Sequence, residues 1–230
     1  MRIESLSFKF EPQQDSFFHD LSANFEPYQV HFIQGDNGIG KSTLFNILQG
    51  RIDEHAVCEL SVMLEGAHYT AQNNTVPYAF TQLVHTVQQR YDRMIADRFS
   101  FIENVRMANM SRYPGLGRLP QATIYSITEL MEIDVHKPAY LLSGGQRQLL
   151  AIVMALQKPT KVLLLDEPTA TLDNTNTHLI IQCLNELAAQ LKVTMLIICH
   201  DLAVVEAYAG QHNRFVLQKA ADGKRVLVQL

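Results

Sequence analysis

The chain has 230 residues, with 19 Lys and Arg against 23 Asp and Glu, which gives a formal net charge of −4 at pH 7. Hydrophobic residues make up 47% of the chain, a balance that excludes an intrinsically disordered protein, and the slightly acidic charge gives no electrostatic reason to expect nucleic acid. Apolar runs such as Val162–Leu165 are too short for a membrane-spanning helix, and Met1–Glu4 lacks the apolar run of a secretory signal. The three Cys are scattered without disulfide or zinc spacing, which suits a reducing compartment. We therefore expect a cytoplasmic chain.

Short strands are expected in the first part of the chain. Residues alternate between apolar and polar in Ile3–Phe10, and Val30–Gln34 is rich in residues that favour strands. Val57–Leu64 and Leu83–Gln88 predict two further strands. A helical pattern over Thr43–Leu48 separates the two pairs.

A glycine-rich loop, GDNGIGKST, lies between the second strand and this helix. Its glycines let the backbone curl so that successive N–H groups converge on phosphate oxygens, and the helix N-terminus favours negative charge. Lys41 is placed to reach the β- and γ-phosphates, and the Ser42 hydroxyl can bind Mg²⁺. The candidate nucleotide-binding residues are Gly35, Asp36, Asn37, Gly38, Ile39, Gly40, Lys41, Ser42 and Thr43.

The composition changes after about residue 90, where a helical insertion is predicted. Helix-like spacing occurs in Ile102–Met110 and Ile124–Ile133. Some apolar residues of the insertion are either adaptable contacts for a partner or plain core residues: Met94, Ile95, Met107 and Met110.

From Ser143 onward, helices and strands alternate. The pattern predicts helices over Gln146–Leu156 and Thr177–Leu191, and strands over Val162–Leu165 and Thr194–Cys199. Both strands are continuously apolar, which is typical of a parallel sheet covered on both faces. The alternation therefore predicts a doubly wound α/β core.

Two carboxylates follow the first of these strands. Asp166 ends the strand near the phosphate loop, where a carboxylate can hold Mg²⁺ through water. Glu167 is placed to polarise an attacking water as the general base.

Four motifs follow one another along the chain: the phosphate loop, LSGGQ at 142–146, VLLLDEPTATLD at 162–173, and His200. With these motifs in this order, the chain closely resembles the ATP-binding subunit of ABC transporters. The resemblance covers essentially the whole chain. It implies a P-loop NTPase (RecA-like) core with a mainly parallel sheet, an N-terminal antiparallel β subdomain and an inserted α-helical subdomain. All 230 residues would form one domain: residues 1–90 its β-rich part with the P-loop, residues 91–140 the helical subdomain, and residues 141–230 the remainder. The ligands would be ATP and Mg²⁺.

The resemblance also assigns roles to residues outside the phosphate loop. His200 would hydrogen-bond the γ-phosphate, and Asp173 would carry signals between two copies. The LSGGQ segment of one copy would close over the ATP of the other, so two complete sites need a head-to-tail dimer. The residues that would meet the nucleotide in this way are Ser143, Gly144, Gly145 and Gln146.

Two assignments stay open. The family has a glutamine that contacts Mg²⁺ and the attacking water, for which Gln82, Gln88 and Gln89 are candidates; Gln89 is preferred because the run FSFIENV resembles the helix start that follows this glutamine. Phe10 occupies the place of an adenine-stacking Tyr, with Phe8 or a plain core role as the alternative.

The function implied is an ATPase that powers solute transport through separate membrane permease subunits, on the cytoplasmic face of a bacterial inner membrane. An importer with a solute-binding protein is preferred. The alternatives are an exporter or lipoprotein-release ATPase, a soluble ABC ATPase outside transport, and a regulatory subunit without turnover. The intact set of Lys41, Asp166, Glu167 and His200 argues against the last.

Overall fold

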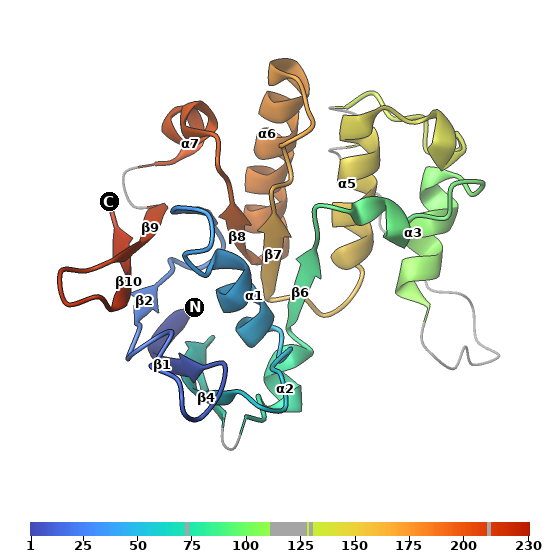
Figure 1. The fold of residues 1–230 in the computed structure, drawn as a ribbon. Helices are drawn as coiled ribbons and strands as arrows, with labels where there is room; N and C mark the ends of the chain where they lie inside the picture. Colours follow the sequence, from blue (N-terminus) through green and yellow to red (C-terminus); the bar gives the residue numbers. More distant parts are fainter. Residues whose placement is uncertain (72–73, 111–127, 129–130, 211–212) are drawn as a thin grey trace.

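The computed structural model describes residues 1–71, 74–110, 128, 131–210 and 213–230. Two sheets and the helices packed on them make up this part of the chain (Figure 1). The α/β class expected from the sequence is confirmed. No helix within the described ranges is both long enough and apolar enough to cross a membrane.

The larger sheet has six strands in the order β10-β9-β3-β8-β7-β6. All neighbours pair in parallel except β10 and β9, which form an antiparallel hairpin. The strands are β3 (Val30–Gln34), β6 (Val84–Val87), β7 (Val162–Asp166), β8 (Thr194–Ile198), β9 (Arg214–Lys219) and β10 (Arg225–Gln229).

Both faces of this sheet are buried. Successive side chains of a strand point to opposite sides, and each side packs into its own hydrophobic core. In β7, Leu163 and Leu165 belong to the core under α5 (Gly144–Ala155) and α6 (Asn174–Leu191). Val162 and Leu164 belong to the core on the other side, with α1 (Lys41–Leu48) and the smaller sheet. The continuous apolar runs thus give the doubly covered parallel sheet that the sequence predicts.

The smaller sheet is antiparallel and has the order β2-β1-β4-β5. It is the N-terminal β subdomain implied by the resemblance. Its strands are β1 (Arg2–Lys9), β2 (Ala23–Asn24), β4 (Val57–Leu64) and β5 (Ala67–Ala71).

The inserted region begins with a 3₁₀ turn, η1 (Tyr91–Met94), followed by α3 (Phe101–Asn109) and a second turn, η2 (Ala139–Leu141). In Figure 1, α5 stands between α3 and α6, and buried residues of all three helices share one hydrophobic core. The helix expected over Ile124–Ile133 lies largely outside the described residues.

The apolar residues of the inserted region do not all have the same environment. Met94, Met107 and Met110 are exposed, whereas Ile95 is only 7% exposed and packs in the core. Of the two alternatives left open by the sequence, Ile95 is therefore a core residue, and its side chain anchors the segment to the fold.

Several short elements were not predicted. They are β2, β5, the β9–β10 hairpin, α2 (Tyr78–Thr81) and α7 (Leu202–Tyr208). These elements have only two to seven residues and carry little local pattern, so pairing with neighbouring strands and packing on the core decide them.

Candidate functional site

The glycine-rich loop connects β3 to α1 and leaves the first turn of that helix open. Gly40 is the N-cap residue with φ 117°, and it has no side chain with which to cap the helix. A Cβ at Gly40 would lie 2.5 Å from the Phe17 ring, so a side chain is excluded there by both space and backbone angle. The uncapped N–H groups of the first turn are donors that suit an anion such as a phosphate group.

Lys41 is buried at the start of α1 and turns back onto the loop. Its Nζ donates to the carbonyl oxygens of Gly35, at 2.7 Å, and Asp36, at 3.0 Å. Burial lowers the pKa of this ammonium group, and the negative charges of Glu167, Asp36 and Asp166 oppose the shift. Ser42 is exposed in the same turn.

Two adjacent carboxylates stand at the end of β7. Burial, and then the negative charge of Glu167, raise the pKa of Asp166. Glu167 has φ 51°, a left-handed conformation that is rare for a residue with a side chain, and its N–H donates to the Ile198 carbonyl at 3.0 Å. A cation beside this pair would offset the repulsion, so the donor set of Asp166 with the Ser42 hydroxyl fits Mg²⁺.

Glu167 is the centre of a polar group built from three strands. His200 Nε2 lies 3.0 Å from Glu167 Oε1, and Gln89 Nε2 donates to Glu167 Oε2 at 3.5 Å. Glu167, His200 and Gln89 follow the carboxyl ends of the parallel strands β7, β8 and β6, which meet at one edge of the sheet. Gln82 precedes β6 and lies at its opposite end, away from this edge.

The LSGGQ segment caps α5 rather than contacting the phosphate loop. Ser143 is the N-cap, and its hydroxyl accepts from the Gln146 N–H in a capping box. A Cβ at Gly145 would lie 2.9 Å from Asn176 Oδ1, which shows how closely α5 approaches α6. Ser143 and Gly144 are exposed, so this helix N-terminus is open to an external ligand.

Asp173 has a local structural role in the isolated chain. It is the N-cap of α6, and its carboxylate accepts from the Asn176 N–H at 2.8 Å and from Asn176 Nδ2 at 2.9 Å. These hydrogen bonds hold the pKa of Asp173 below its usual range.

An aromatic group lies beside the phosphate loop. Phe10 is 44% exposed and packs edge-on against Phe17, with ring centroids 4.9 Å apart, whereas Phe8 is only 4% exposed. Phe17 is the ring that approaches Gly40. Of the two candidates for a base-stacking residue, Phe10 is therefore the one with an accessible face near the loop.

Arg225 was not identified from the sequence. From β10 its guanidinium lies 3.6 Å from the centre of the Phe17 ring and donates to the carbonyl oxygens of Ile39, at 2.9 Å, and Phe17, at 3.0 Å. A lone Arg in an alternating strand gives no sequence signal of such a contact, which spans 186 residues between Arg225 and Ile39.

The family profile described as ABC transporter matches residues 18–170. The chain belongs to the ABC transporter family. As an ABC ATPase it is an ATP-binding and ATP-hydrolysing subunit.

Relatives of this ABC ATPase have several transport roles. A tyrosine transport ATP-binding protein of Clostridioides difficile is 31% identical over 88% of this chain and 82% of its own length. A lipoprotein-releasing system ATP-binding protein, LolD, of Saccharophagus degradans is 32% identical over 84% of this chain and 83% of its own. Among solved structures, cbiO1 of Clostridium perfringens has a TM-score of 0.73 at 24% identity, covering 99% of this chain and 86% of that one, which supports the shared fold.

Proposed function

We propose that this ABC ATPase powers solute import through separate membrane permease subunits, as a head-to-tail dimer on the cytoplasmic face of the membrane. The observation that supports ATP hydrolysis most directly is the convergence of His200 and Gln89 on Glu167 at one sheet edge. Asp166 and Lys41 lie close to each other near this edge, and the charge of each affects the pKa of the other. This arrangement supplies a general base, a hydrogen-bond donor to the γ-phosphate and a cation site together. The similarity to a phosphonates import ATP-binding protein supports the import role.

In the proposed reaction, the loop N–H groups and Lys41 hold the triphosphate, and Lys41 gives up its carbonyl partners to reach it. Asp166, Ser42 and Gln89 would hold Mg²⁺, which neutralises charge on the phosphates when bound. Glu167 orients the attacking water and accepts its proton, and His200 donates to the γ-phosphate. Phe10 stacks on adenine.

The two-copy assembly follows from what one chain supplies. Ser143 and Gly144 are exposed at the N-terminus of α5, where they can meet a ligand from outside the chain. Contacts with α6 and with the inserted region hold this terminus in place on its own chain. The signature segment of one copy would therefore serve the ATP held by the other, with Gly145 and Gln146 completing it and Asp173 near the contact.

The permease would contact the inserted region, residues 91–140. Exposed apolar side chains gather on α3 and the turn before it, around a hollow of about 220 Å³ lined by Phe99, Glu103, Arg106, Met107 and Met110. An apolar hollow with one acidic and one basic residue at its border suits a short amphipathic segment of a partner.

The first experiment replaces the base. Glu167→Gln keeps the shape of the side chain but removes its ability to accept a proton, so steady-state phosphate release should fall by about 100-fold or more. The same variant should accumulate an ATP-bound dimer, measured by size-exclusion chromatography with light scattering. Glu59→Gln, on the exposed face of β4, is the matched control. Unchanged turnover in Glu167→Gln would remove Glu167 from its role.

Lipoprotein release is the second candidate, because the LolD relative is as similar to this chain as the amino-acid transport relative. The neighbouring genes discriminate between them. A permease gene with a solute-binding protein gene supports import, and a permease of the lipoprotein-release kind overturns it.

A further inference from the structure

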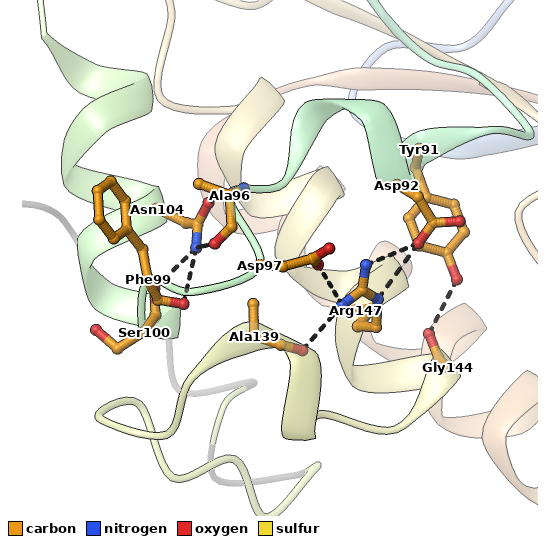
Figure 2. Close-up of polar contacts among 10 residues, drawn as sticks. All are labelled: Tyr91, Asp92, Ala96, Asp97, Phe99, Ser100, Asn104, Ala139, Gly144 and Arg147. Carbon is orange, nitrogen blue, oxygen red and sulfur yellow. Dashed lines mark hydrogen bonds and ion pairs between the residues drawn. The ribbon is translucent and has the colours of Figure 1, made fainter.

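Arg147, the residue after LSGGQ, connects three separate segments of the chain (Figure 2). Its Nη2 lies 2.9 Å from Asp92 Oδ1, and its Nη1 lies 2.8 Å from Asp97 Oδ1. Nη1 also donates to the Ala139 carbonyl at 3.0 Å. The side chain is only 17% exposed, although both carboxylates are more than half exposed. A guanidinium with several fixed donors is well suited to holding separate segments in one arrangement.

A second contact joins the same two regions in the opposite direction. The Tyr91 hydroxyl of η1 donates to the Gly144 carbonyl in the first turn of α5 at 3.3 Å. Arg147 of α5 in turn donates to Asp92 of η1. Tyr91 is 9% exposed and belongs to the hydrophobic core, so its ring is fixed by packing. The two contacts together hold the signature segment against η1.

The stretch that carries Asp97 is itself held in place. Asn104, 1% exposed in α3, accepts from the Ala96 N–H at 2.8 Å and donates to the carbonyl oxygens of Phe99, at 3.2 Å, and Ser100, at 3.0 Å. Figure 2 shows these bonds on one side of Asp97 and the Arg147 group on the other. The Asp97 carboxylate that Arg147 meets therefore belongs to a fixed segment and not to a loose loop.

Gln89 lies two residues before Tyr91 along the same stretch and contacts Glu167. A movement of Gln89 toward or away from the γ-phosphate therefore acts on η1 after a very short length of chain. Because η1 is joined to α5 by Tyr91 and Arg147, such a movement reaches the signature segment through these contacts.

We propose that Arg147 is a positioning residue that makes the Gln89 segment and the signature segment move as one unit. The ATP site of one copy then sets the position of the signature segment that closes over the other copy. This inference rests on the proposed function, since it needs Gln89 at the γ-phosphate and the signature segment acting in the dimer.

A double-mutant cycle tests the proposal on the full chain. Arg147→Ala should lower kcat about tenfold while the Kd of the monomer for ATP changes less than about twofold, because the phosphate loop is untouched. In a Gln89→Ala background, Arg147→Ala should lower kcat by less than about twofold more, because residues that act through one another are not additive. Arg147→Lys, with one charge but no fork of donors, should lie between wild type and Arg147→Ala.

Arg98→Ala is the matched control, since Arg98 is an exposed Arg of the same stretch and its loss should leave kcat unchanged. A purely structural role for Arg147 predicts effects on kcat that multiply with those of Gln89→Ala, and that result overturns the proposal. So does a wild-type kcat for Arg147→Ala. If Arg147→Ala does not fold, the exposed pair Asp92→Asn with Asp97→Asn replaces it, with the same expected and contrary results.

Glu167→Gln, measured alongside, separates this inference from the proposed function. If Glu167→Gln hydrolyses ATP like the wild type, the proposed mechanism fails and the Arg147 proposal fails with it. If Glu167→Gln is inactive but the cycle with Gln89→Ala is multiplicative, only the role of Arg147 is overturned.

Discussion

At the residue scale, two phenylalanines two positions apart have different surroundings. Phe8 lies within β1 and is buried, and it exchanges backbone hydrogen bonds with Phe18. Phe10 lies just past the end of β1, where the chain leaves the sheet and the ring turns outward against Phe17. The end of the strand, rather than the residue type, makes one ring a core residue and the other a candidate stacking surface.

These surroundings predict opposite effects of the same substitution. Phe10→Ala should weaken ATP binding by about 1–3 kcal/mol, the usual size of a base–aromatic stack, with little loss of stability. Phe8→Ala should instead cost about 3–5 kcal/mol of unfolding free energy through the cavity it leaves. Nucleotide titration and urea unfolding of both variants measure the two effects, and Phe10→Tyr is the conservative control. Equal ATP affinity in wild type and Phe10→Ala would reject the stacking role.

At the element scale, the C-terminal hairpin β9–β10 supports the phosphate loop. β9 pairs in parallel with β3, the strand that leads into the loop, and Arg225 on β10 holds the Ile39 carbonyl and the Phe17 ring. The hairpin therefore fixes both the loop and the aromatic group beside it.

Arg225→Ala should therefore weaken ATP binding, by about tenfold or less, since two charge-assisted hydrogen bonds and a cation–π contact are lost at a partly exposed site. The effect should appear in KM more than in kcat, because Glu167 and His200 are not touched. Lys219→Ala, at the exposed end of β9, removes the same charge from the same hairpin and should bind ATP normally. Steady-state kinetics of the two variants give the comparison, and equal KM values would argue against the hairpin's role.

At the scale of the whole molecule, a buried histidine links stability to pH. His31 in β3 is fully buried against the Phe25 and Phe215 rings, and its Nε2 donates to the Glu26 carbonyl at 2.8 Å. Its Nδ1 has no hydrogen-bond partner among the described residues. Burial lowers the pKa of His31 from 6.5, because a proton on Nδ1 would place an unpaired charge in the core.

The unfolded chain therefore binds more protons than the folded one below pH 6.5, and stability should fall as the pH drops from this value toward the lower pKa of the folded state. The contribution of His31 to the slope is at most about 1.4 kcal/mol per pH unit. His31→Phe keeps an aromatic ring but cannot titrate, so its stability should change less between pH 6.5 and 5. Urea unfolding across this range measures it, with the exposed His55→Ala as control. A slope equal to that of wild type would exclude His31 as the group responsible.

Much of the fold could be predicted because its signals are local. The apolar runs of β7 and β8 and the periodic pattern of α6 show their structure in consecutive residues, and the phosphate loop needs only nine residues in order. Short elements such as α7 and β5 carry no such local pattern, and packing on the core or pairing with a neighbouring strand decides them.

The sequence by itself determined the nucleotide loop, the carboxylates after β7 and the family to which they belong, because each is a run of neighbouring residues with fixed chemistry. Only the tertiary structure decided that Gln89 and not Gln82 lies beside Glu167, that Phe10 and not Phe8 is exposed, and that Arg147 and Arg225 hold distant segments. These outcomes depend on which strand ends share an edge and which side chains meet across the fold. The family resemblance favours Gln89 and Phe10 without deciding between the candidates, and a single Arg gives no sign of such a contact in its own neighbourhood.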